Sequence, residues 1–297
     1  MQSESLQLVP ATMTTRFRSQ VSITEQRGFR IIQVNGIPAH AVGQFPNRGN
    51  PHSIAQSNGT YRVTLNPKQN RRLNPLQMNV NFGVAVNGVM FDPGAAEFWL
   101  GNPRSGWQYE ALGGAVPLGL DANYAHVQPD GNYHYHGLPT GLLKSLEAGP
   151  GEHSPLIGWA ADGFPIYAQY GYTDAEDSSS PVKELLSAFR LRRGTRPGGN
   201  RGSQSAPGGQ YDGAFVNDYE FVSSIGDLDE CNGRYCVTPE FPDGTYAYFL
   251  TTDFPVIPRN FRGTPDRSFQ KRMGPPPGGG PPGGFGGGRP PGPPPRR

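Results

Sequence analysis

Proline and glycine interrupt this chain so often that long regular elements are excluded. The 297 residues include 42 glycines and 32 prolines, together about twice the usual share. Turn signals recur: Pro-Asp-Gly stands at 129–131 and 242–244, and Asp-Gly at 162–163 and 212–213. Proline presets φ in such turns and glycine accepts a positive φ. The pattern predicts a chain of antiparallel hairpins.

The segments between the turns are rich in β-branched and aromatic residues, which favour strands. Strands are predicted at 29–34, 60–65, 78–86, 158–161, 164–168, 215–222 and 245–251. One helix is predicted after Ser180, with Pro181 in its first turn, Gly194 at its end and an apolar stripe that includes Leu185 and Phe189. The predicted fold is mainly β with one or two helices, in a compact, loop-rich single domain.

Composition divides the chain into three parts. Residues 1–16 are expected to form a polar leader, 17–265 one domain, and 266–297 a disordered tail rich in proline and glycine. No apolar run is long enough to span a membrane. The first twenty residues lack the apolar stretch of a signal peptide, so the sequence itself carries no export signal. The net charge is only +2, and without a basic stripe nucleic acid is not an expected partner.

Three histidines fall on one predicted hairpin. His134 and His136 are two residues apart, so they point to the same face of a strand, while Tyr133 and Tyr135 point to the other. A three-residue loop at 129–131 pairs His126 with His134, which brings the third histidine to that face. A two-residue loop would send His126 to the opposite face.

Three converging imidazoles predict a metal site. Three protein nitrogens with an open position suit Zn²⁺, and tetragonal nitrogen ligation suits Cu²⁺. The alternative is a set of hydrogen-bonded histidines in a polar groove. His153 is a candidate fourth ligand. Asp121 and Asp162 are candidates for a general base, or for carboxylates that orient the metal-bound histidines.

The sequence around these histidines resembles the YHYH family. Tyr133-His134-Tyr135-His136 is the tetrapeptide that names the family, and similar text extends through 85–93, 153–167 and 230–249. The resemblance covers most of residues 30–260. Met90 departs from it, because a proline is expected there. Family members are typically exported bacterial proteins, which implies a periplasmic or secreted location, but the resemblance implies no settled activity.

Two cysteines frame a turn signal. Cys231 and Cys236 enclose Asn232-Gly233, so a disulfide is the first expectation, with a reduced pair or half of a metal site as alternatives. A disulfide would place the protein outside the cytosol. Oxygen ligands for Ca²⁺ are a weaker expectation, at residues just before and within this turn: Asp227, Asp229, Glu230 and Asn232.

Three functions follow from these patterns. The first is an exported protein that captures Cu or Zn through the histidine face. The second is a metal-dependent hydrolase in which the ion activates a water for attack on a small-molecule or polymer substrate. The third is an adhesive or carbohydrate-binding module that uses Trp99, Trp107 and Trp159 as stacking surfaces. A closed four-ligand shell would favour capture, an open three-ligand cleft catalysis, and dispersed histidines the third function.

Overall fold

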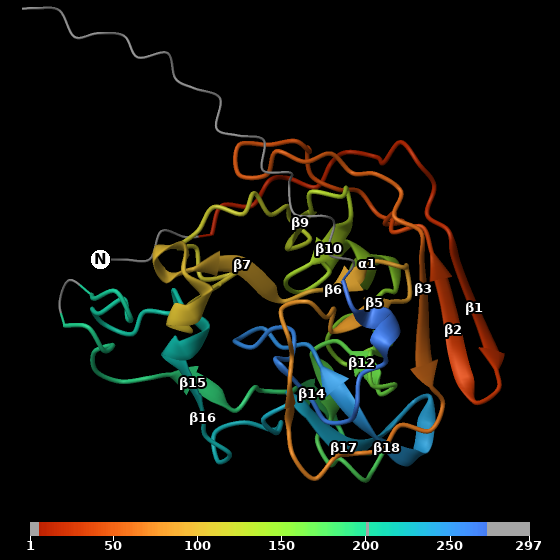
Figure 1. Ribbon diagram of the computed structural model, residues 1–297. Coiled ribbons are helices and arrows are strands. Elements are labelled where there is room, and N and C mark those ends of the chain that lie inside the picture. The colour runs from red at the N-terminus through yellow and green to blue at the C-terminus, as the bar shows by residue number, and fades with distance from the viewer. Residues whose placement is uncertain (1–5, 200–201, 272–297) are drawn as a thin grey trace, which may run out of the picture.

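The alternation of short strands and turns builds one large mixed sheet. A computed structural model describes residues 6–199 and 202–271 (Figure 1). The eight strands of the sheet lie in the order β17 (Gly233–Thr238), β18 (Phe241–Phe249), β12 (Pro165–Tyr167), β11 (Leu156–Ala160), β5 (Gly83–Ala85), β6 (Met90–Phe91), β10 (Tyr133–Tyr135) and β9 (Ala125–Val127). Neighbours run antiparallel, except that β6 pairs with β10, and β12 with β18, in parallel.

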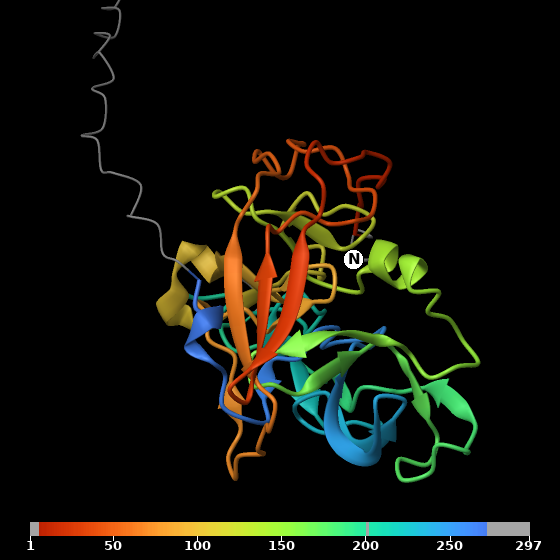
Figure 2. The same cartoon turned by 90° about the vertical axis from the view of Figure 1, so that its right-hand side faces the viewer.

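A second sheet lies against the first. It comprises β1 (Val21–Gln26), β2 (Phe29–Val34) and β3 (Gly59–Thr64), and Figure 2 shows it in front of the rest of the molecule. Ile32 and Val63 of this sheet share one core with Phe82, Tyr135 and Tyr248 from the large-sheet side. The two sheets therefore bury a common apolar layer, and the molecule is mainly β, as predicted.

Small two-stranded sheets complete the fold. They are β4 (Asn74–Pro75) with β19 (Asn260–Phe261), β7 (Gly94–Phe98) with β8 (Gln108–Glu110), β13 (Tyr170–Tyr172) with β14 (Val182–Glu184), and β15 (Phe189–Leu191) with β16 (Tyr219–Phe221). The described residues hold one α-helix, α1 (Thr140–Ser145), and 3-10 turns at Trp99–Gly101, Pro103–Ser105, Val216–Asp218 and Arg267–Phe269. No helix in the described ranges has the length and apolar character needed to cross a membrane.

The prediction of a helix after Ser180 is wrong. This segment forms β14 and β15, which pair with β13 and β16. Leu185 is buried in a second core cluster with Tyr167 and Phe249, whereas the next residue, Leu186, is 51% exposed. Tertiary pairing with distant strands thus overrides a local pattern of caps and apolar residues.

The fold extends beyond the predicted domain limits at both ends. Val9 and Met13, placed in the leader, form β-bridges with Asp121 and Val42. Phe269, placed in the tail, is fully buried in the main core. Most of the predicted tail, residues 272–297, lies outside the described ranges.

The expected disulfide is not formed. Cys231 and Cys236 are both free thiols and both buried. Cys231 lies in the turn before β17 and joins the main core cluster, whereas Cys236 lies within β17 and joins the second cluster. The turn lies two residues earlier than predicted: Asn232 donates its N–H to the Asp229 carbonyl, and Asp229 donates its N–H to the Gly233 carbonyl. The two thiols therefore pack in different core clusters instead of facing each other.

Candidate metal centre

The loop between β9 and β10 fixes the register of the histidine hairpin. Gly131 donates its N–H to the Gln128 carbonyl, and Gln128 donates to the Asn132 carbonyl, both at 2.9 Å. Gly131 has a φ of +87°, and a Cβ there would lie 2.5 Å from the Cβ of Ala55. The three-residue loop pairs Val127 with Tyr133 and His126 with His134, as the turn chemistry predicted.

The two faces of this hairpin have opposite characters. Tyr133 and Tyr135 are fully buried in the main core. Tyr133 donates its hydroxyl to Asp121 at 2.7 Å, and the Tyr135 hydroxyl lies 2.5 Å from Nε2 of His40. The tyrosines thus anchor the strand, which leaves its other face to the histidines.

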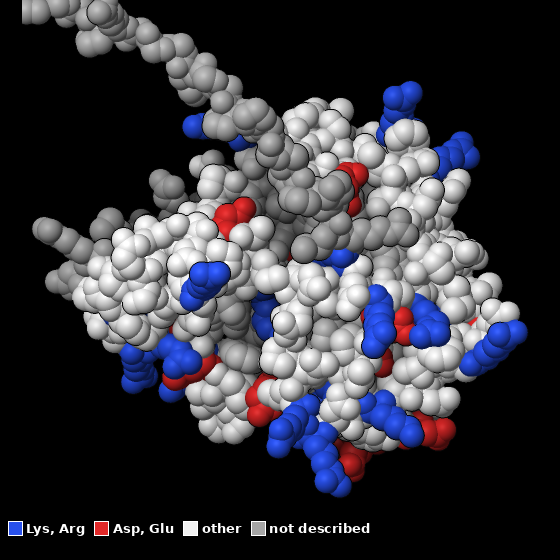
Figure 3. Space-filling view, in the orientation of Figure 1, with Lys and Arg blue, Asp and Glu red and all other residues white. Residues whose placement is uncertain are grey.

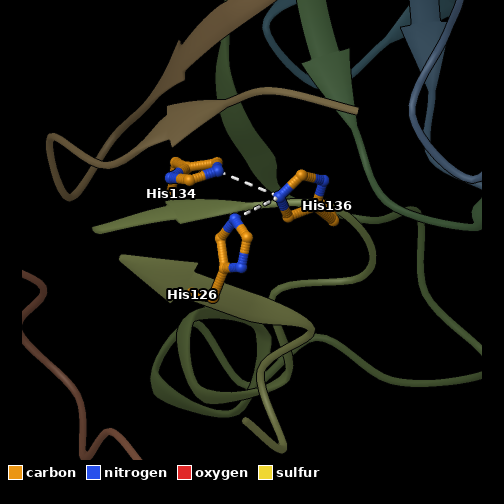
Figure 4. Close-up of side chains that lie close together, drawn as sticks. All are labelled: His126, His134 and His136. Carbon is orange, nitrogen blue, oxygen red and sulfur yellow. Dashed lines mark hydrogen bonds between the residues drawn. The ribbon is translucent and has the colours of Figure 1, made fainter. Parts of the chain in front are cut away.

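His126, His134 and His136 converge on that other face (Figure 4). Nε2 of His136 lies 2.9 Å from Nε2 of His134 and 3.1 Å from Nε2 of His126. One potential ligand nitrogen from each ring lies within 4.8 Å of the other two. His134 and His136 are each 2% exposed, and His126 is half-buried.

Two of the three rings are oriented by backbone carbonyls. Nδ1 of His126 lies 2.8 Å from the Leu118 carbonyl, and Nδ1 of His134 lies 3.2 Å from the Asn132 carbonyl. Because a carbonyl only accepts, each Nδ1 carries a proton, and each neutral ring presents an Nε2 lone pair to the centre of the cluster. Nδ1 of His136 is buried without a hydrogen-bond partner among the described residues.

Burial keeps these imidazoles uncharged. It lowers the pKa of His134 and of His136 well below the usual value, and the neighbouring histidines lower both further. Burial also lowers the pKa of His126, although the His126–Leu118 hydrogen bond and the charges of Glu97 and Asp92 act in the opposite direction. Neutral rings have the lone pairs that a metal ion requires.

The nitrogen separations from His136 to its two neighbours suit ligands of a single ion. Ligands at the Zn–N length of about 2.0–2.1 Å, separated by angles of about 90–110°, lie about 2.9–3.4 Å apart. Two of the three nitrogen separations, 2.9 and 3.1 Å, fall in this range, and the third pair lies within 4.8 Å. The cluster can therefore hold a metal ion. Among the described residues, no fourth His, Cys, Asp or Glu joins the group, so the donor set is three nitrogens.

Charged residues that the sequence patterns did not single out surround the cluster. Asp92 follows β6, the parallel neighbour of β10, and its buried carboxylate accepts from Gln128 at 3.0 Å and Lys271 at 2.6 Å. Arg259 and Lys271 both lower the pKa of His136. No local turn joins β6 to β10, so the sequence does not reveal that Asp92 lies near the histidines. Its position directly after a strand is the one feature that could have drawn attention to it.

The carboxylates predicted beside the histidines lie elsewhere. Asp121 accepts from Tyr133 and from the Gly43 N–H, on the tyrosine face of the hairpin. Asp162 accepts from the Tyr248 hydroxyl at 2.5 Å and the Gly263 N–H at 2.8 Å. Neither makes a hydrogen bond to the cluster, where the outer nitrogens of His126 and His134 contact backbone carbonyls instead.

His153 does not join the cluster either. Its ring packs between Tyr167, Tyr172 and Phe249, with centroid distances of 5.1, 4.8 and 6.0 Å. Tyr167 and Phe249 belong to the second core cluster and lie on β12 and β18, in the half of the large sheet away from β9 and β10. Its place before the Asp162-Gly163 turn made it a candidate fourth ligand, but the order of the strands separates it from the histidine hairpin.

The other predicted sites are also dispersed. Asp227 pairs with Lys183, and Asp229 accepts from Tyr246 and two backbone N–H groups, so these oxygens are engaged within the protein. Trp99 and Trp107 pack edge-on against Phe215, whereas Trp159 is 7% exposed and lies beneath Arg30. The tryptophans do not form one stacking surface. On the face seen in Figure 3, acidic and basic side chains are intermingled.

Comparison with known proteins gives one match. No curated protein and no solved structure matches the chain significantly. A family model described as "YHYH protein" matches residues 60–263, which include the histidine hairpin and six further strands of the large sheet. Because this match covers more than half of the chain, the protein belongs to the YHYH family.

Proposed function

We propose that this protein is an exported metal-binding protein that holds one Cu or Zn ion through His126, His134 and His136. The observation that supports this function best is the convergence of three Nε2 atoms, 2.9 and 3.1 Å apart along the cluster, with two rings held in the required tautomer by carbonyls. The export part of the proposal is supported by the family, whose members are usually exported.

Buried lone pairs supply the physical reason for an ion at this position. In the metal-free protein the close Nε2 contacts require a proton between the rings, which Nε2 of His136 can carry because its Nδ1 has no hydrogen-bond partner among the described residues. A divalent cation takes the place of that proton and gains three ligand nitrogens that already converge, so little side-chain entropy is lost on binding. A nitrogen-only set suits Zn²⁺ and Cu²⁺ better than Mg²⁺ or Ca²⁺, which prefer oxygen.

The test is metal titration of metal-free protein by calorimetry, with elemental analysis after dialysis. We expect one Zn²⁺ or Cu²⁺ per chain, and a loss of tight binding in the His134→Ala, His136→Ala double variant. His153→Ala is the matched control, since that ring is also partly buried but lies outside the cluster. Unchanged affinity in the double variant would rule out the site, and an equal loss in His153→Ala would show that the ligand set is a different one.

A metal-dependent hydrolase is the second candidate function. Three protein ligands leave a coordination position for water, as in catalytic zinc sites. A cavity of about 310 Å³ is lined in part by Tyr124 and Leu138, each two residues from a cluster histidine. Zn²⁺-loaded protein should then hydrolyse activated esters or phosphoesters faster than the His134→Ala variant. Equal rates for the two proteins would exclude this function for those substrates.

A further inference from the structure

The cavity beside the histidine cluster is lined by both aromatic and acidic residues. It has a volume of about 310 Å³, and its lining includes the aromatic residues Tyr124, Tyr219 and Phe254 and the acidic residues Glu110 and Asp253. Volumes of about 300 Å³ lie at the lower end of small-ligand pockets. Within residues 6–199 and 202–271, no lysine or arginine lines it. The cavity is thus aromatic and acidic, which is the pairing that receives an organic cation.

One of its two carboxylates carries an unbalanced charge. Glu110 is paired with Arg259 through a contact of 2.5 Å, so its charge is neutralised. Asp253 is exposed, and its carboxylate has no ion-pair or hydrogen-bond partner within the described ranges. A cationic ligand would therefore meet Asp253 without displacing an existing partner.

The aromatic wall is preorganised. Tyr219 and Phe254 stack with centroids 3.9 Å apart and planes 8° from parallel. Arg259 already lies 5.7 Å from the Phe254 centroid, which shows that this ring accepts a cation nearby. Burial raises the pKa of Tyr219 to about 12, and the charge of Asp253 is among those that add to this shift.

We propose that this cavity binds a small protonated amine, with the ammonium group against Asp253 and the organic body against Tyr124, Tyr219 and Phe254. The site is coupled in space to the histidine hairpin, because the Tyr124 carbonyl accepts the His136 N–H at 2.7 Å. Binding of the amine does not require a metal, so the proposal stands or falls separately from the metal function.

The experiment is an NMR titration of the metal-free full chain with three probes of similar shape: phenethylamine, the neutral 2-phenylethanol and the anionic phenylacetate. The amine should bind most tightly and shift the amides of Tyr124 and of residues 252–254. Asp253→Asn should weaken amine binding about threefold or more, as expected for an exposed ion pair, and leave the alcohol unchanged. Phe254→Leu should weaken both, and the amine more.

Two controls separate this site from other effects. Asp243→Asn removes the same charge from an exposed position of β18 outside the cavity and should leave amine binding unchanged. The His134→Ala, His136→Ala variant should retain amine binding while it loses the metal. The proposal is overturned if the alcohol or the anion binds as tightly as the amine, if Asp253→Asn and Asp243→Asn act equally, or if millimolar amine shifts none of these amides.

Discussion

Adjacent residues of the YHYH tetrapeptide have different roles: the histidines are candidate metal ligands and the tyrosines pack in the core. His134 is a candidate ligand, whereas Tyr135 is fully buried on the opposite face, and its hydroxyl accepts from Asn87 at 2.9 Å and contacts His40. Tyr135→Ala should therefore lower the free energy of unfolding by roughly 3–5 kcal/mol, as loss of a large buried ring does. Chemical denaturation of metal-free protein measures this. Tyr135→Phe keeps the ring and should cost about 1–3 kcal/mol, the penalty for the unsatisfied partners.

The same pair of residues distinguishes stability from ligation. In folded Tyr135→Phe protein the histidine register is intact, so its metal affinity should equal that of the parent chain. His134→Ala should lose metal affinity without the large loss of stability. If Tyr135→Phe abolished metal binding while it remained folded, the tyrosine face would be part of the site, and the division of the strand into two functions would be incorrect.

At the scale of elements, strand pairs joined by a short turn can be predicted from the sequence, whereas pairs of strands distant in the chain cannot. The 129–131 loop determines which residues of β9 and β10 face each other, so the histidine cluster was predictable from the sequence. The parallel pairing of β6 with β10 has no turn signal, so Asp92 was not found. The false helix after Ser180 has the same cause, since its residues pair with β13 and with the distant β16.

Gly131→Ala tests the control that the loop has over the cluster. A left-handed φ costs an alanine about 1–2 kcal/mol, and its Cβ would also collide with Ala55. We expect lower stability and weaker Zn²⁺ binding, because the pairing of His126 with His134 depends on this loop. Gly149→Ala is the control, since it has open space around it and no positive φ. If both variants had equal stability and equal metal affinity, the loop would not be what fixes the pairing of His126 with His134.

The free cysteines give a second prediction for elements. Burial raises the pKa of both thiols, that of Cys231 to about 12, and the two side chains pack in different clusters. Native protein should resist alkylation, because the thiolate is scarce and shielded. After unfolding without reductant, mass spectrometry should find two labels per chain. Finding no label in the unfolded, non-reduced protein would show that the cysteines form a disulfide.

For the whole molecule, Asp162 is a buried charge at a point where distant segments meet. It lies in the turn between β11 and β12 and accepts from Tyr248 of β18 and from Gly263 near the C-terminal end of the described fold. Burial raises the pKa of Asp162 from near 3.8 to about 6, although these hydrogen bonds oppose the shift. The folded protein therefore binds this proton more tightly than the unfolded chain does.

This difference makes stability depend on pH in a defined direction. The contribution of Asp162 is fully present below about pH 4 and is lost as the pH rises through about 6, which amounts to about 3 kcal/mol at most. Denaturation between pH 4 and 7 should show this decline in the parent chain, superimposed on the titration of other groups. Asp162→Asn keeps a neutral acceptor for Tyr248 and should flatten this part of the curve, whereas the exposed control Asp243→Asn should retain it. If stability declined equally with pH in the parent chain and in Asp162→Asn, deprotonation of Asp162 would not be the cause of the decline.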